Sequence, residues 1–376
     1  MAINMKHKKK IRYGVVGLGH IAQSAVLPAF VNAKSNSELV ALISEDPKKL
    51  KVIGKQYKVD HLYTYDNIEE CLESGLIDAL YVATPNDVHR EIVELAAKYQ
   101  IHVLCEKPMA VSKDDCAKMD QAAKRNNIKL MIAYRLHFEA ANLEAIKLCR
   151  EGKLGDLKFF NSDFSFQIKD RKNIRLNDPE MGGGPLHDIG VYCINASRYL
   201  FKDEPKEVFA MTANSGDIRF NQCDETVSVI MRFPNERLAN FTISFGSFDS
   251  SDYEIVGTKG RIRLEHAYDY AEEMKLRMFT EGGKEKVRSF KKRDQFSAEL
   301  LYFSECIQNN KEPEPNATEG MADVKIIEAI YKSIKFGKPI AIDTVVKLMY
   351  PNPKMQINKP GVKKRRVYHA TGPSND

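Results

Sequence analysis

Short apolar runs alternate with helical periodicity along the first 135 residues of the chain. The apolar runs cover residues 11–16, 38–44, 79–83, 102–105 and 129–132. Stretches with apolar positions at helical spacing lie between them, at residues 20–33, 47–57, 88–99 and 112–126. Strands and helices that alternate at this spacing are typical of parallel βαβ units. The pattern predicts an α/β fold, with a Rossmann doubly wound parallel sheet over residues 11–135.

The pattern changes after an amphipathic stretch at residues 139–151. Apolar and polar residues then alternate, as in half-buried strands, at residues 158–166, 207–212, 226–233, 238–244, 253–257 and 261–265. This alternation predicts a meander of antiparallel strands with one packed face. Helical periodicity returns at 299–308 and 322–336. We expect an α+β domain with a large open, mostly antiparallel sheet over residues 136–342, whose last helices are free to return to the Rossmann side.

The composition is consistent with two globular domains, and the distribution of charge predicts a basic tail at each end of the chain. Hydrophobic residues make up 43% and charged residues 29% of the 376 residues, which suffices for a core in each domain. The net charge of +6 comes from the ends, because lysines crowd residues 1–10 and lysines and arginines crowd residues 359–376. We interpret 1–10 and 343–376 as basic, solvated tails, the second extended or disordered, rather than as nucleic-acid or membrane contacts.

Cysteine and histidine usage excludes several classes of site. The seven cysteines are scattered without a Cys-x-x-Cys pair, as is typical of reduced thiols in a cytoplasmic protein. The nine histidines show no His-Glu-x-x-His pattern, so no metal site is expected. The chain contains neither a signal-peptide pattern at its start nor an apolar run of the ~18 residues that a membrane span needs.

A glycine-rich turn follows the first predicted strand and opens a helix. Gly17 permits the tight turn, Gly19 lets the backbone approach a pyrophosphate, and Ala22 allows the helix to pack closely on the sheet. The helix N-terminus then offers free N–H groups to the phosphates. Any glycine-rich turn can match this spacing. Its position at the start of a βαβ unit predicts a dinucleotide site.

The end of the second strand bears on the choice between NADP and NAD. We place Ser44 there, with Glu45 and Asp46 beyond it and Lys48 and Lys49 following. A hydroxyl followed by ammonium groups suits a 2′-phosphate, whereas an acidic residue would accept bonds from an unsubstituted ribose. The pattern favours NADP. A register shift of one residue would place Glu45 on the ribose and favour NAD.

Two further segments carry groups that can move protons. Lys107 follows a strand at the predicted carboxyl edge of the sheet, where a desolvated lysine can donate or accept a proton; an ordinary surface lysine is the simpler interpretation of this residue alone. The glycines at 182–184 lead into a helix on which Asp188 and Tyr192 share a face. A tyrosine hydroxyl beside a carboxylate can relay a proton, although a tyrosine that merely packs fits the spacing equally well.

Taken together, these motifs make the chain resemble the Gfo/Idh/MocA oxidoreductases from about residue 11 to residue 342. The resemblance rests on several motifs in order, namely GLGHIA, ATPNDVH (83–89), CEKPMA (105–110), AYRLHFE (133–139) and GGGPLHDIGVYCIN (182–195). At the position of Tyr192 many members carry histidine. Tyrosine there is typical of the glucose–fructose oxidoreductase, xylose dehydrogenase and dihydrodiol dehydrogenase branch. The C-terminal tail is outside the family pattern.

The resemblance implies roles for individual residues. Lys107 and Tyr192 would be catalytic, with Lys107 positioned by a cis peptide bond before Pro108, and Asp188 and Arg135 would contact the substrate. The implied cofactor-binding residues are Gly17, Leu18, Gly19, His20 and Ile21 at the pyrophosphate, Ser44 and Lys49 at the adenosine end, and Thr84, Pro85, Asn86, His89, Glu106, Lys107 and Arg135 towards the nicotinamide.

The implied function is that of an NADP-dependent oxidoreductase, with NAD the less favoured cofactor. It would move hydride between nicotinamide and a hydroxyl or carbonyl of a sugar or cyclic diol, like an aldose dehydrogenase or glucose–fructose oxidoreductase. Residues 136–342 would bind substrate and form a homodimer or homotetramer through the open sheet. The alternative is a dinucleotide-binding sensor without catalysis, against which the retained Lys107 and Asp188 argue.

Overall fold

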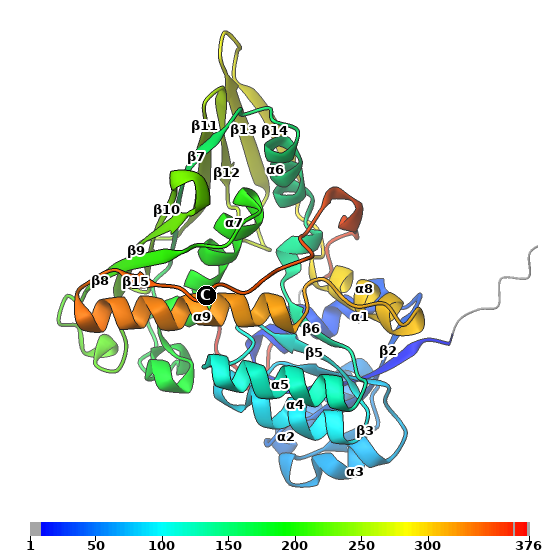
Figure 1. The fold of residues 1–376 in the computed structure, drawn as a ribbon. Coiled ribbons are helices and arrows are strands. Elements are labelled where there is room, and N and C mark those ends of the chain that lie inside the picture. The colour runs from blue at the N-terminus through cyan, green and yellow to red at the C-terminus, as the bar shows by residue number, and fades with distance from the viewer. Residues whose placement is uncertain (1–8, 364, 374–376) are drawn as a thin grey trace, which may run out of the picture.

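A computed structural model describes residues 9–363 and 365–373, and Figure 1 shows the fold. Of the predicted N-terminal tail only Lys9 and Lys10 fall within the described residues. Six parallel strands form the first sheet, in the order β3-β2-β1-β4-β5-β6. They are β1 (Ile11–Val16), β2 (Ser37–Ile43), β3 (His61–Tyr63), β4 (Ala79–Val82), β5 (His102–Glu106) and β6 (Leu130–Ala133).

Helices cover both faces of this sheet, as predicted for a doubly wound fold. Alternate side chains of β1 point to opposite faces of the sheet: Val15 packs in the core beneath α1, and Val16 packs in the core beneath α4. The helices are α1 (Leu27–Ala33), α2 (Pro47–Tyr57), α3 (Ile68–Glu73), α4 (His89–Lys98) and α5 (Lys113–Arg125). The sequence did not reveal β3 and α3, which are short and partly exposed.

The second sheet has nine strands in the order β14-β13-β12-β11-β7-β10-β9-β8-β15. Two helices, α6 (Ala140–Arg150) and α7 (Val191–Phe201), lie against one face of it (Figure 1). Its strands are β7 (Leu157–Ser165), β8 (Glu207–Ala213), β9 (Thr226–Phe233), β10 (Arg237–Ser244), β11 (Ser250–Gly257), β12 (Gly260–Glu265), β13 (Met274–Thr280), β14 (Lys286–Phe290) and β15 (Ile340–Ala341).

The predicted antiparallel meander is correct only in part, because β7 and β10 pair in parallel. The chain leaves β7 through a long loop and α7 and returns to the sheet at β8. The hairpins β8–β9 and β9–β10 then bring β10 alongside β7 in the same direction. A crossover through a helix is the usual way to join parallel strands. The sheet is therefore mixed, though mostly antiparallel as expected.

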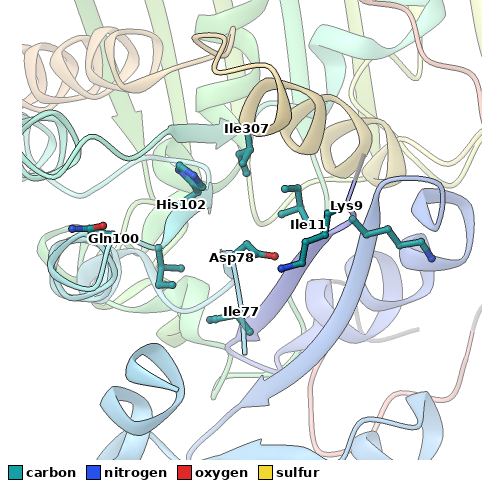
Figure 2. Close-up of a pocket in the computed structure, with 9 residues that line it drawn as sticks. Lys9, Ile11, Ile77, Asp78, Gln100, His102 and Ile307 are labelled. Atoms are coloured by element: carbon teal, nitrogen blue, oxygen red, sulfur yellow. The ribbon is translucent and has the colours of Figure 1, made fainter. Parts of the chain in front are cut away.

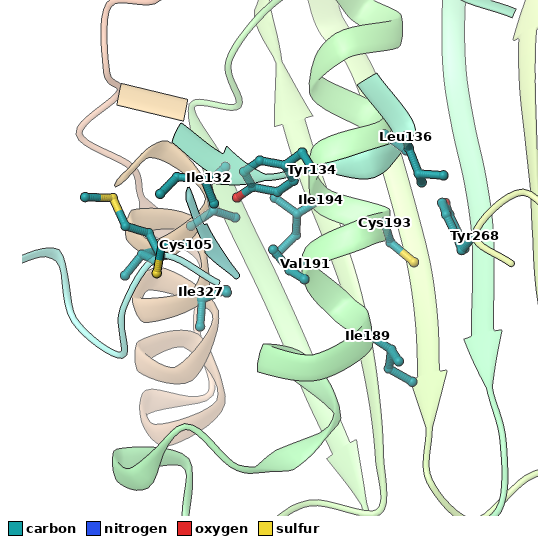
Figure 3. Packing of buried hydrophobic residues seen from close by; sticks show 14 of the residues in the cluster. Cys105, Ile132, Tyr134, Leu136, Ile189, Val191, Cys193, Ile194, Tyr268 and Ile327 are labelled. Carbon is teal, nitrogen blue, oxygen red and sulfur yellow. The ribbon is translucent and has the colours of Figure 1, made fainter. Parts of the chain in front are cut away.

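The last two helices link the two sheets. Helix α8 (Phe296–Gln308) packs on α1, β1 and β2, so it does return to the Rossmann side. Helix α9 (Ala317–Phe336) contacts β8, α5, α7 and β6 and runs between the large sheet and the Rossmann domain (Figure 1). Its Ile327 lies in one continuous apolar core with Val191 and Ile194 of α7 and with Ile132 of β6 (Figure 3). No described helix combines the length and the apolar character of a bilayer span.

Buried ion pairs join α7 to α9. Arg198 of α7 is 0% exposed and donates to Glu204 at 2.6 Å, to Glu319 at 3.0 Å and to Asp323 at 2.6 Å. Asn195, one turn earlier, also donates to Glu319 and Asp323. An ion buried this deeply is tolerable only when it is paired and hydrogen-bonded. The network therefore sets how α7 lies on α9.

The C-terminal segment packs on the protein. The ammonium group of Lys347, 4% exposed, pairs with Glu319 and lies 3.7 Å from Glu314. Further on, the Ile357 N–H donates to the Phe138 carbonyl at 3.3 Å. Its longest regular element after β15 is one short turn, η10 (Pro353–Met355). The extended character is as expected, but the structure corrects the expectation of a solvated tail, because Lys347 is buried against the carboxylates of Glu314 and Glu319 and Arg365 donates to the Gln56 carbonyl.

Replacing Arg198 by methionine should destabilise the protein by roughly 3–5 kcal/mol, because buried carboxylates would lose their cation. Urea unfolding followed by circular dichroism measures the change. The control is Arg232→Met. Arg232 pairs with Glu236 at 2.6 Å but its side chain is 48% exposed, so the expected loss is at most about 1 kcal/mol. Equal losses for the two variants would contradict the role given to Arg198.

Candidate active site

The loop between β1 and α1 has the geometry that a close ligand requires. Gly17 adopts φ +86°, and a Cβ atom there would lie 2.5 Å from the Ala83 carbonyl oxygen, so a side chain would clash. A Cβ atom on Gly19 would meet nothing within 4 Å. The chain itself thus gives no reason for a glycine at 19, whereas a pyrophosphate lying over the loop does. The residues present fit the predicted nucleotide.

The rest of the predicted loop divides into supporting and accessible residues. Leu18 is 2% exposed and belongs to the core beneath α1. His20 and Ile21 are partly exposed. Gln23, 2% exposed, donates from its side chain to the Leu18 carbonyl at 2.7 Å and so braces the loop from behind.

At the adenosine end, the structure gives Asp46 a role that the sequence did not reveal. Its Oδ1 accepts from the backbone N–H groups of Lys48 at 2.9 Å and Lys49 at 3.0 Å, which caps α2. Its Oδ2 lies 3.1 Å from Nδ1 of His369. The backbone bond from Lys49 and the bond with His369 lower the pKa of Asp46. Ser44, which directly follows β2, is 3% exposed.

On the nicotinamide side, the loop after β4 contains one unsatisfied polar atom and one interdomain bond. The buried hydroxyl of Thr84 has no hydrogen-bond partner, and such an atom is costly unless a ligand completes it. Pro85, next along, is exposed. The Asn86 side chain donates to the Gly182 carbonyl at 2.9 Å, which ties this loop to the glycine cluster of the second domain.

His89 serves this loop from inside the protein. It is 0% exposed, and its two ring nitrogens lie 3.1 Å from the Thr84 carbonyl and 3.2 Å from the Pro108 carbonyl. Burial lowers the pKa of His89. The structure thus corrects the predicted cofactor contact: with both nitrogens occupied and no exposed surface, His89 positions the Thr84 and Pro108 loops against each other.

Beneath the nicotinamide side lie two carboxyl groups, that of the half-buried Glu106 and that of the buried Glu299. Glu106 accepts a 2.8 Å hydrogen bond from the Tyr81 hydroxyl. Glu299 of α8 is 0% exposed and neither of its oxygens has a partner. Burial and the nearby Glu106 raise the pKa of Glu299 well above its usual value, which favours its neutral form. Sequence reasoning missed Glu299, because an acid inside a helical pattern reads as an exposed position.

Lys107 reaches from the Rossmann domain to the second domain. Its peptide bond to Pro108 is cis, as predicted. Its Nζ donates to the Asp188 carbonyl at 2.7 Å and to the Asp188 Oδ1 at 3.3 Å. Arg175 donates from Nε to Oδ2 of the same carboxylate at 2.8 Å. The sequence showed Arg175 only as part of a polar loop, because nothing local marks its partner.

Neighbouring charges keep this pair ionised. Burial alone would lower the pKa of Lys107, but Tyr192, Asp188 and Glu106 raise it by more, so its pKa lies above the usual value. Burial raises the pKa of Asp188, but Arg175 and Lys107 lower it by more, so the net shift is downward. At neutral pH Lys107 is therefore an ammonium donor and Asp188 a carboxylate acceptor.

Tyr192 lies between two cations. The Lys107 Nζ is 4.7 Å from the centroid of its ring, and the Arg135 guanidinium carbon is 5.0 Å from it. The ring of Phe164 packs edge-on at 5.7 Å. Cations near a phenol stabilise the negative charge that develops on its oxygen as the proton leaves. Tyr192 thus has the surroundings of a proton-transfer group.

Arg135 supports this arrangement from a buried position. It is 5% exposed, donates to the Tyr268 carbonyl at 2.5 Å and also donates to the Gln295 side chain. Its guanidinium therefore contacts the Tyr192 ring with its orientation already fixed by neighbouring groups. In this structure Arg135 positions and polarises Tyr192.

One cavity lies apart from this arrangement, at the opposite edge of the Rossmann sheet. Figure 2 shows this space of about 270 Å³, lined by Lys9, Asp78, His102 and Ile307 among others. It lies beside the amino-terminal ends of β1, β4 and β5. Open α/β sheets bind ligands at the carboxyl ends of their strands, so this cavity is not the candidate site. Within residues 9–363 and 365–373 no group of three or more His, Cys, Asp or Glu side chains could hold a metal.

A Rossmann sheet with an open glycine loop, joined through Lys107 to a sheet domain that presents Asp188 and Tyr192, defines a class of nucleotide-dependent oxidoreductases. Residues 11–134 match the model of an oxidoreductase family with an NAD-binding Rossmann fold, and residues 142–263 match the Gfo/Idh/MocA C-terminal domain. The chain belongs to the Gfo/Idh/MocA family of oxidoreductases, as the sequence predicts.

Individual relatives fall in the predicted branch. The D-xylose 1-dehydrogenase [NADP(+)] of Haloarcula marismortui is 29% identical, over 89% of this chain and 93% of its own. A trans-1,2-dihydrobenzene-1,2-diol dehydrogenase of Xenopus laevis is 28% identical over 67% of this chain and 74% of its own. The crystal structure of an aldose–aldose oxidoreductase from Caulobacter crescentus, complexed with glycerol, is 37% identical, covers 89% of this chain and 100% of its own, and superposes with a TM-score of 0.84.

Removing the Tyr192 hydroxyl as Tyr192→Phe should lower kcat by about 10²–10⁴-fold, the usual contribution of a positioned acid or base. Steady-state kinetics measures it, with whichever aldose or cyclic diol of the panel described below the parent protein turns over. Tyr253→Phe is the control, because Tyr253 loses a hydroxyl that bonds Asn142 at 3.2 Å outside the site. Near-parental turnover of Tyr192→Phe would show that Tyr192 only packs.

Proposed function

We propose that this protein is an NADP-dependent oxidoreductase that transfers hydride between nicotinamide and a hydroxyl or carbonyl of an aldose or cyclic diol. One observation carries the proposal: Lys107, at the carboxyl edge of the nucleotide-binding sheet, bonds Asp188 of the second domain directly beside Tyr192. The relatives act on xylose, dihydrodiols and aldoses according to their names, which supports the same substrate class here.

The groups of the site divide the work of such a reaction. When bound, the nucleotide supplies or accepts the hydride. Tyr192 takes the proton of the substrate hydroxyl during oxidation and returns it during reduction. Lys107 donates a hydrogen bond to the reacting oxygen and stabilises its negative charge. Asp188 orients Lys107 and accepts from a neighbouring sugar hydroxyl, while Arg175 keeps Asp188 ionised.

The adenosine end favours NADP over NAD. Both oxygens of the Asp46 carboxylate are engaged, by the α2 cap and by His369, so Asp46 is not free to accept a ribose hydroxyl. Ser44 and the nearby Lys48 and Lys49 remain as donors for a 2′-phosphate. Gly17 to Ile21 would hold the pyrophosphate, and Thr84, Asn86 and Glu106 would border the nicotinamide. The Haloarcula relative is named for NADP(+).

The decisive test separates an enzyme from a sensor that only binds nucleotide. We expect NADP reduction, followed by nicotinamide absorbance, with at least one member of a panel of aldoses and cyclic diols. Lys107→Met should abolish turnover while it preserves NADPH binding measured by fluorescence, because Lys107 acts on the substrate oxygen. NADPH binding with silence across the panel in both reaction directions would favour the sensor.

We propose further that two copies associate through the outer face of the large sheet. Four apolar side chains on adjacent strands of that face are exposed, namely Met211 at 65%, Ile230 at 49%, Leu238 at 43% and Phe159 at 39%. Phe159 and Leu238 are direct partners across β7 and β10. Neighbouring exposed apolar groups mark interaction surfaces.

We also propose that the protein works in the cytoplasm. All seven cysteines are buried and unpaired, which suits a reducing compartment.

A charge on the outer face of the large sheet should dissociate the oligomer. Ile230→Glu is expected to shift the mass measured by sedimentation equilibrium from dimer or tetramer towards monomer, since an unpaired carboxylate would be buried in the contact. Ile218→Glu is the control, because Ile218 is similarly exposed at 56% but lies in a turn outside the sheet. A monomeric parent protein would remove the proposal.

A further inference from the structure

The C-terminal segment reaches the nucleotide side of the Rossmann sheet. After Lys359 and Pro360, which bond residues near α8 and α1, the chain passes the end of α2, where Arg365 donates to the Gln56 carbonyl at 2.8 Å and lies over the Tyr57 ring. It then arrives at the carboxyl edge of the sheet. We call residues 365–372 the clasp.

The clasp is bound to the phosphate loop through its main chain. Gln23 accepts from the Tyr368 N–H at 2.8 Å and donates to the Tyr368 carbonyl at 2.9 Å. The same amide group donates to the Leu18 carbonyl at 2.7 Å. The Tyr368 ring packs against the core beneath α1. A side chain that is 2% exposed therefore joins the clasp and the loop predicted to hold the pyrophosphate.

The next residue of the clasp closes the adenosine end. His369 lies 3.1 Å from Oδ2 of Asp46, and its ring stacks on Tyr368 with the centroids 3.9 Å apart. Asp46 lies two residues after Ser44, the position where an acid would accept the ribose hydroxyls of NAD, and its backbone N–H donates to the Ser44 hydroxyl at 3.4 Å. His369 occupies the carboxylate oxygen that the α2 cap leaves free, and the partial positive charge of its N–H faces the Asp46 charge.

Beyond His369 the clasp crosses to the second domain. The Gly372 carbonyl accepts from the Asn173 side chain at 3.1 Å, and Asn173 is 5% exposed. The other end of this amide accepts from the Arg175 N–H at 3.1 Å, and Arg175 binds Asp188. The clasp thus extends from the adenosine end of the Rossmann domain to the loop whose Arg175 binds the Asp188 carboxylate.

We propose that the clasp is the outer wall of the dinucleotide site and that His369 is a specificity-determining residue for the 2′-phosphate of NADP. The inference rests on the proposed function. With the clasp closed, a dinucleotide lying between the glycine loop and Ser44 is covered on its solvent side and leaves only when the clasp opens. With His369 on Asp46, the carboxylate can neither bind a 2′-hydroxyl nor repel a 2′-phosphate at full strength.

The test measures nucleotide binding itself. Affinities of NADPH and NADH come from fluorescence titration, and dissociation rates from stopped-flow displacement, on the full chain, on a chain ending at residue 364 and on His369→Ala. We expect the shortened chain to release NADPH about tenfold faster or more. We expect His369→Ala to lower the ratio of NADPH to NADH affinity about tenfold, which is the loss of one charge-assisted contact. Thr371→Ala, exposed in the same clasp, should match the parent.

Each other outcome decides against one specific claim. Equal NADPH dissociation rates for the full chain and a folded shortened chain would overturn the clasp as a wall. Faster NADPH association to the shortened chain without faster release would overturn it too, because the segment would then block entry to the site. An unchanged NADPH to NADH ratio in His369→Ala would overturn the specificity role, and this variant stays informative if the shortened chain does not fold. If the full chain binds neither nucleotide, it is the proposed function that fails.

Discussion

The buried guanidinium of Arg198 is the interaction on which the arrangement of this protein depends. A charge with no solvent access is stable only when it is paired, and here Glu204, Glu319 and Asp323 surround it. Because Arg198 lies on α7, this requirement sets the rotation and height of α7 against α9. The turn η7 (Leu186–Gly190) leads directly into α7. The charge network therefore also fixes the positions of Asp188 and Tyr192, although it lies away from the reacting groups.

The site exists only where the two domains meet. The Rossmann sheet supplies Lys107 and the glycine loop, and the second domain supplies Asp188 and Tyr192. Hydrogen bonds cross the boundary beside the nicotinamide side, from Lys107 to the carbonyl and Oδ1 of Asp188 and from Asn86 to the Gly182 carbonyl. Since α9 packs on both halves, a shift of one domain against the other would break these bonds and expose the apolar core that they share.

Local patterns predicted most of this protein, and contacts between distant segments account for what they missed. The glycine loop, Lys107 and the pair Asp188 and Tyr192 are recognisable because each is defined by its immediate neighbours in the sequence. Arg175 was visible but had no partner assigned, since the Asp188 carboxylate is reached only through tertiary folding. Contacts of the clasp with the Rossmann domain span more than 300 residues, and the parallel pairing of β7 with β10 depends on a crossover. Periodicity carries no information about either.

The buried cysteines have a practical consequence for the chemistry that this molecule can undergo. Burial raises the pKa of every thiol, to about 11 for Cys71 and Cys306 and to about 12 for Cys149, Cys193 and Cys223. Thiolate, the species that peroxides and alkylating reagents attack, is therefore scarce at neutral pH. The protein should tolerate air without added reductant. A single cysteine placed on its surface would be the one readily modified group, ready to carry a spectroscopic label.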